Sequence, residues 1–152
     1  MRSPVSAWRQ VGFSEDGSWV SGTAVIGYGD GDDDTVITGM QGVHWGLYLR
    51  KTFTVDPLDI PSQLTLRIYV DDGCIVWLNG VEVYRSPEMP AGPPAWNTDA
   101  LSHESSNRSA PVYNPMVDIS APSNAAVLCR MFTILTLTLA LALADRGALR
   151  RS

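Results

Sequence analysis

Apolar and polar side chains alternate along several segments of the first 120 residues. Over residues 45–55, leucine, phenylalanine and valine alternate with tyrosine, arginine and threonine, and Lys51 is the exception on the apolar side. Over residues 64–70, Leu64, Ile68 and their apolar neighbours point one way, while Arg67 and Tyr69 point the other. A repeat of two residues is typical of a half-buried β-strand. We therefore predict a strand in each segment.

A β-hairpin is predicted immediately after the second strand. Residues 71–73 read as a turn, residues 74–78 as a strand, and residues 81–85 as its return strand. Between them lies Asn79-Gly80, and Asn-Gly between two apolar runs is a strong hairpin signal because a type I′ turn needs positive φ at both central residues. Asp71 and Asp72 are adjacent on an extended chain, so we expect turn chemistry from them and no paired-carboxylate catalysis.

The remaining segments are shorter and more irregular. A short strand is predicted over residues 24–28 and another over 111–120, while residues 86–123 otherwise form a proline-rich connection. No stretch before residue 120 has a sustained helical period. The sequence therefore predicts an all-β domain over residues 1–123.

Composition narrows the class of partner. The chain is 45% hydrophobic and 18% charged, which is ordinary for a globular protein. Residues 1–120 hold 15 of the 16 acidic residues and 7 of the 11 basic ones, so the body of the chain is acidic. An acidic body argues against a nucleic-acid partner. No signal peptide is recognisable at the N-terminus, so we expect either an intracellular protein or part of a longer secreted one.

Residues 124–152 form an atypical apolar and basic tail with three open interpretations. Leucine alternating with threonine and alanine suits a strand, whereas leucine and alanine also favour a helix. Residues 131–144 carry no charge, but 14 residues are short for a membrane span, and arginines follow them. A membrane partner is expected only if this tail is an anchor. The third interpretation is a frameshifted end.

An acidic loop is the first candidate site. Its carboxylates come from Asp30, Asp32, Asp33 and Asp34, and alternate carboxylates can converge on Ca²⁺. The calcium-loop pattern is incomplete, because Gln41 occupies the position of its final Glu. A solvated turn is the favoured interpretation, and a calcium site formed by Asp30, Asp32 and Asp34 is the alternative.

Aromatic residues are the second candidate. Exposed rings in a β-sandwich can stack on sugars, although most large aromatic side chains pack in cores. As ligand-binding residues we single out Trp96, in the proline-rich segment, together with Tyr69 and Trp77. No nucleophile, zinc or phosphate-loop motif is present, so we expect no catalytic residues and no enzyme activity. Cys74, within a predicted strand, is expected to be a buried free thiol.

The combination of these motifs resembles a family. "GYGD", "YLRKTF", "DDG", "LNG" followed by "EV" and Arg85, and "MPAG" together resemble the galactose-binding-like jelly-roll domain over roughly residues 8–92. Such domains accompany the catalytic domains of large secreted proteins and are similar to sugar-binding domains of glycoside hydrolases. The family has one more strand before Trp8 and a different closing strand. Reading the codons of residues 128–134 one base back can give a sequence close to that closing strand.

The resemblance implies a jelly-roll β-sandwich, complete or lacking strands, that works without catalysis of its own. We expect a carbohydrate-binding accessory module whose partner is a glycan, outside the cell, as part of a longer secreted protein. The alternative is a structural or protein-interaction sandwich that packs beside a catalytic domain and takes no small ligand.

Overall fold

The protein is strand-rich with almost no helix in a computed structural model that describes residues 6–29, 31–54, 62–105, 112–120 and 134–142. The elements are the 3₁₀ helix η1 (Ser6–Arg9) and the strands β1 (Ile26–Gly27), β2 (Thr35–Val36), β3 (Gly46–Thr54), β4 (Thr65–Leu66), β5 (Gly73–Leu78), β6 (Val81–Arg85), β7 (Val117–Asp118) and β8 (Ile134–Ala142). The expectation of an all-β fold is therefore confirmed at the level of class.

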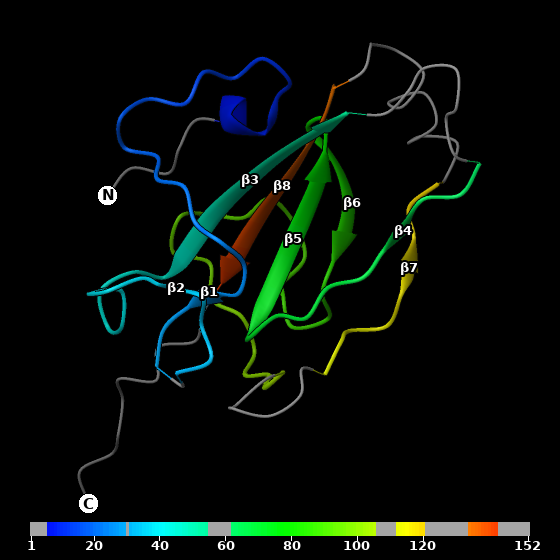
Figure 1. Ribbon diagram of the computed structural model, residues 1–152. Helices are drawn as coiled ribbons and strands as arrows, with labels where there is room; N and C mark the ends of the chain where they lie inside the picture. Colours follow the sequence, from blue (N-terminus) through cyan, green and yellow to red (C-terminus); the bar gives the residue numbers. More distant parts are fainter. Residues whose placement is uncertain (1–5, 30, 55–61, 106–111, 121–133, 143–152) are drawn as a thin grey trace, which may run out of the picture.

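The strands form one larger sheet and two small ones (Figure 1). The larger sheet has the order β3-β8-β5-β6, while β1 pairs with β2 and β4 pairs with β7. The predicted strand over residues 45–55 is present as β3, whereas only Thr65–Leu66 of residues 64–70 is regular strand. Antiparallel pairing dominates, because only β1 and β2 run parallel among the described strands.

Strand β8 lies in the middle of the larger sheet, although it comes from the tail. It pairs antiparallel with β3 on one side, where Leu49 is opposite Leu139, and with β5 on the other, where Val76 is opposite Leu139. Of the three interpretations of the tail, the structure has the strand over Ile134–Ala142. The rest of the tail lies outside the described residues. Within the described part of the chain, no helix is long and apolar enough to cross a membrane.

The hairpin of β5 and β6 turns at the predicted residues. Asn79 has φ of 50° and Gly80 has φ of 84°, so both central residues adopt the left-handed conformation that the Asn-Gly pair tolerates. Leu78 is opposite Val81, and a register shift follows between Val76 and Trp77. The hairpin prediction is therefore confirmed.

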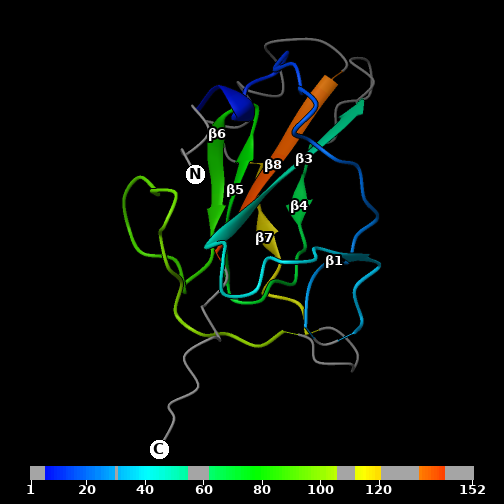
Figure 2. The same ribbon diagram turned by 90° about the vertical axis from the view of Figure 1, so that its left-hand side faces the viewer.

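Both faces of β5 are covered, which explains why all six of its residues are buried. Ile75 and Trp77 pack with Trp8 of η1 and with Met89 and Ala100 of the following loop. The alternate residues pack into a second core that includes residues of β4 and β7, and its buried members are Leu66, Val70, Cys74, Val76 and Ile119. Figure 2 shows β4 and β7 beside the larger sheet. Because successive strand residues point to opposite faces, the two cores lie on opposite sides of β5.

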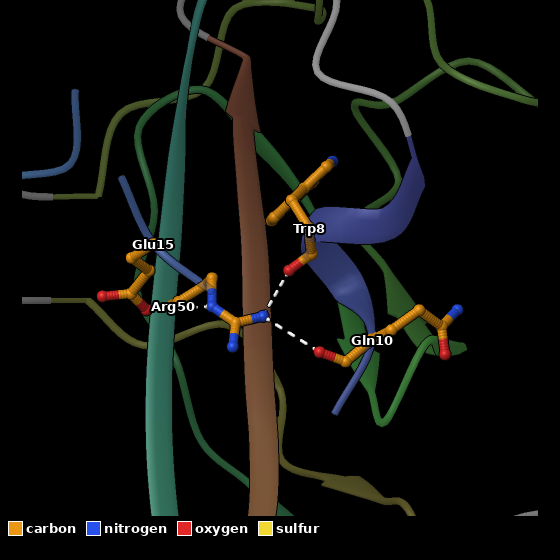
Figure 3. Close-up of polar contacts among 4 residues, drawn as sticks. All are labelled: Trp8, Gln10, Glu15 and Arg50. Atoms are coloured by element: carbon orange, nitrogen blue, oxygen red, sulfur yellow. Dashed lines mark hydrogen bonds and ion pairs between the residues drawn. The ribbon is translucent and has the colours of Figure 1, made fainter. Parts of the chain in front are cut away.

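Arg50 of β3 holds the N-terminal segment against the larger sheet (Figure 3). Its guanidinium donates hydrogen bonds to the carbonyl oxygens of Trp8 and Gln10, and its Nε lies 3.0 Å from Oε1 of Glu15. The guanidinium carbon also lies 5.1 Å from the ring centroid of Phe13. The side chain of Arg50 is only 5% exposed, whereas that of Glu15 is 50% exposed. A buried charge needs such partners, so these contacts fix where η1 packs.

Candidate functional site

The candidate site is a surface cluster formed by Tyr69, Tyr113 and Arg67, which we call the Tyr69–Tyr113 cluster. The two rings meet edge to face, with centroids 5.3 Å apart and planes at 89°. The guanidinium carbon of Arg67 lies 3.9 Å from the ring centroid of Tyr113. Tyr113 is 41% exposed, Arg67 is exposed and Tyr69 is half-buried. The cluster combines aromatic surface with a fork of N–H donors at the solvent boundary.

Pairing beyond β4 and β7 brings the two tyrosines together. Thr65 is opposite Asp118 in the regular ladder, and the N–H of Asn114 donates to the carbonyl oxygen of Ile68 at 2.9 Å. The two extended segments therefore run side by side as far as Tyr69 and Tyr113. Side chains of residues 64–70 point alternately to the two sides of this segment. On the inner side, Leu64, Leu66, Ile68 and Val70 pack into the second core. Arg67 and Tyr69 consequently lie on the outer side, as the sequence pattern predicts.

Three carboxylates between β1 and β2 act electrostatically on Tyr69. The pKa of Tyr69 is raised, first by burial, then by Tyr113, and then by the carboxylates of Asp32, Asp34 and Asp33. Burial and nearby negative charge both disfavour the phenolate, so both raise the pKa. One predicted ligand residue, Tyr69, is thus within electrostatic range of two predicted metal ligands, Asp32 and Asp34.

Backbone contacts at both ends hold this acidic loop. The N–H of Thr35 donates to the carbonyl oxygen of Val25 at 2.9 Å, and the N–H of Ile37 donates to that of Gly27 at 2.8 Å. A Cβ at Gly27 would lie 2.6 Å from Oδ1 of Asp33, so a larger residue there would force the Asp33 side chain to shift. The carboxylate of Asp33 therefore packs directly on the backbone of β1.

The calcium expectation gains no support from the structure. Asp30 lies outside the described residues, and within the part of the chain that is described no group of three or more His, Cys, Asp or Glu side chains is placed to hold a metal ion. Calcium binding by Asp30, Asp32 and Asp34 stays a prediction.

The two predicted tryptophans occupy different environments. Trp96 is 48% exposed and lies within a turn that is closed by two hydrogen bonds between Ala95 and Thr98, of 2.7 and 3.2 Å. Trp77 is only 2% exposed, and its ring meets that of Trp8 edge to face with centroids 5.8 Å apart. The guanidinium carbon of Arg9 lies 4.6 Å from the Trp77 ring centroid. The ring of Trp77 packs in the core under η1, so it has little surface to offer a ligand, and its role in binding stays a prediction.

Asp72 has the structural role expected of the Asp71-Asp72 pair. Its carboxylate is buried, and Oδ1 accepts a hydrogen bond of 2.8 Å from the backbone N–H of His103. The bond joins the start of β5 to the end of the proline-rich connection, 31 residues away. The carboxylate thus caps a backbone donor of a distant loop.

Sequence reasoning did not single out Tyr113 and Arg67 as site residues. Tyr113 belongs to a weak strand pattern, and only its pairing with the segment after β4 places it against Tyr69. Arg67 was assigned to the outer face by alternation, which was a usable signal, but its partner ring is 46 residues further along the chain.

Cys74 is a buried free thiol, as predicted. Burial raises its pKa to about 12, and the negative charge of Glu88 acts in the same direction, while a hydrogen bond with Ser86 opposes them. The thiolate is the reactive form of cysteine, so this side chain is suited to packing and not to nucleophilic chemistry.

A pH dependence follows from the raised pKa of Cys74. The unfolded thiol ionises near its ordinary pKa of 9.0 and the folded thiol only near about 12, so the thiol's contribution to stability is present below pH 9 and is lost as the pH rises through that window. In a Cys129→Ser background, we expect the free energy of unfolding to fall more steeply between pH 8 and pH 10.5 with Cys74 than with Cys74→Ala. Urea titrations at several pH values measure both slopes, and equal slopes would contradict the burial of the thiol.

Comparison of the chain with profiles of known protein families, with curated proteins and with solved structures gave no match.

Proposed function

We propose that this chain is a non-catalytic carbohydrate-binding module on a jelly-roll type sandwich, and that the Tyr69–Tyr113 cluster is its binding site. The observation that carries the proposal is the pair of tyrosine rings at 89° beside an exposed guanidinium. A pyranose presents an apolar C–H face and a rim of hydroxyls. An aromatic ring can stack on the C–H face, and guanidinium donors and carboxylate acceptors can form hydrogen bonds with the hydroxyls.

The packing of the larger sheet supports the binding role. β4 and its extension are anchored through Leu66 and Val70 in the second core, so the outward Arg67 and Tyr69 project from a supported segment. A site on supported backbone loses little conformational freedom when a ligand binds, which favours affinity. The natural setting that we propose is an accessory position in a longer secreted protein.

Binding can be tested by calorimetric titration with the β-1,4-linked tetramers of glucose, galactose and mannose. At least one tetramer is expected to bind, and Tyr113→Ala and Tyr69→Ala are each expected to weaken it about tenfold or more, since tenfold corresponds to about 1.4 kcal/mol of lost contact. Thermal unfolding of each variant checks that the fold is kept.

Trp96→Ala is the matched control, because Trp96 is similarly exposed but lies on the proline-rich loop. It is expected to leave the affinity unchanged. If Trp96→Ala abolishes binding and Tyr113→Ala does not, the site is misplaced. If no tetramer binds, the structural or protein-interaction alternative replaces the proposal.

A further inference from the structure

We infer that the Tyr69–Tyr113 cluster holds a single sugar unit, so that its ligands are soluble or branched glycans and not the flat faces of crystalline polysaccharides. The inference rests on the proposed function and goes beyond it by naming how much of a glycan is bound and, with it, the class of ligand. It follows from how the two rings and the guanidinium of Arg67 lie relative to one another.

The distance between the two rings would by itself suit a longer ligand. Their centroids are 5.3 Å apart, which is close to the repeat of successive units in a β-1,4-linked chain. Each unit of such a chain presents an apolar C–H face, so two rings lying flat next to each other could stack on two units at once. The spacing therefore permits one unit or two, and the orientation of the rings decides between them.

The orientation of the rings excludes stacking on two successive units. Their planes are at 89° and the contact is edge to face. A β-1,4-linked chain is a flat ribbon whose neighbouring units present C–H faces that are nearly parallel. When one unit lies flat on the ring of Tyr69, the next unit meets the ring of Tyr113 at a right angle and cannot stack on it. The two rings therefore do not form a platform.

Arg67 occupies a further part of the aromatic surface. Its guanidinium carbon lies 3.9 Å from the centroid of Tyr113, which is contact distance, so one face of that ring is covered. The edge-to-face contact covers one more ring face. The two faces that remain are either the opposite faces of Tyr69 or perpendicular faces of the two rings. In neither case do two open faces lie side by side in one plane.

Both tyrosines contribute although one unit binds. Tyr69 is half-buried on a segment that is anchored in the second core, and Tyr113 is 41% exposed. One ring stacks on the C–H face of the sugar, and the other fixes the orientation of the first through their edge-to-face contact. The exposed guanidinium of Arg67 supplies N–H donors for the hydroxyls of the same unit.

The test compares the tetramer that binds best with the methyl glycoside of its single unit, by NMR titration, which also measures weak affinities. A tetramer offers up to four equivalent units, so statistics alone can raise its affinity about fourfold. We expect the methyl glycoside to bind no more than about tenfold more weakly than the tetramer. A larger difference would show that further units are held and would overturn the inference.

Met116→Ala separates a site for one unit from a longer one. Met116 is 71% exposed on the segment that carries Tyr113, so a chain held along that segment would contact its side chain. We expect both affinities to stay within about twofold of those of the unchanged protein. If Met116→Ala weakens the tetramer beyond that and spares the methyl glycoside, a second unit is bound and the inference fails.

Adsorption to microcrystalline cellulose provides a second measurement, because its surface consists of flat β-1,4-glucan ribbons. We expect none. Adsorption that Tyr113→Ala abolishes would refute the single-unit site and leave the location of the binding site standing. If the tetramer, the methyl glycoside and cellulose all fail to bind, the proposed function fails and the inference falls with it.

Discussion

Leu139→Pro is expected to destabilise the fold by about 3 kcal/mol or more, because β8 is an inner strand of the larger sheet that pairs with β3 on one side and with β5 on the other. In such a strand every backbone N–H is directed to one neighbour or the other. Proline removes one donor, leaves a buried carbonyl of a neighbouring strand without its partner, and introduces a ring that the ladder cannot accommodate. Urea unfolding followed by tryptophan fluorescence measures the loss.

Leu139→Val is the control at the same position, since it keeps the N–H and favours extended backbone. It is expected to change the free energy of unfolding by no more than about 1.5 kcal/mol. A proline variant as stable as the valine variant would show that residues 134–142 do not pair between β3 and β5 in solution.

Arg50→Met is expected to cost about 2–4 kcal/mol of the free energy of unfolding. The substitution removes the donor to the carbonyl oxygens of Trp8 and Gln10. The carbonyl oxygen of Gln10 still accepts from the N–H of Phe13, but that of Trp8, a buried residue, loses this partner unless η1 moves off β3. Trp8 would move with η1, so part of the first core is lost as well. Chemical denaturation gives the energy, and quenching of tryptophan fluorescence by iodide reports the exposure of Trp8.

Arg85→Met is the control for Arg50→Met. Arg85 also bonds a carboxylate and a carbonyl oxygen, those of Glu82 and Pro90, but its side chain is 20% exposed and its ion pair joins neighbouring residues of one strand. Exposed ion pairs contribute about 0–1 kcal/mol, so the control should lose about 1 kcal/mol or less. Equal losses for the two variants would contradict the role assigned to Arg50.

The sequence predicted those parts of the fold that depend on neighbouring residues. The position of the β5–β6 turn follows from the backbone preference of Asn79 and Gly80 alone, and the outward facing of Arg67 and Tyr69 follows from alternation. β3 was predicted correctly because its period of two runs through nine residues. Each of these signals is complete within about a dozen residues of chain.

Pairings between distant segments could not be read in the same way. The leucine, threonine and alanine of the tail suit strand or helix equally, and what decides for β8 is a place between two strands more than 50 residues away in the sequence. Trp77 and Trp96 likewise look similar in sequence. The two tryptophans differ in exposure because Trp8 and Arg9 of η1 cover the ring of Trp77. This contact joins the N-terminal segment to β5.

In the candidate site, too, the sequence indicated the single residues but not the contacts between distant segments. Tyr69 and the acidic residues were singled out separately, because each belongs to a local pattern. That Tyr113 completes the cluster depends on the pairing that extends beyond β4 and β7, which joins segments about 50 residues apart.

The location of the ligand is the central claim, and an NMR titration of the ¹⁵N-labelled protein with the best-binding neutral tetramer tests it most directly. The account predicts that backbone amide shifts move with the sugar at residues 67–69, 112–114 and 31–35, and that the indole N–H of Trp96 stays in place. Shifts centred on Trp96 and the proline-rich loop, with residues 67–69 and 112–114 unmoved, would contradict it.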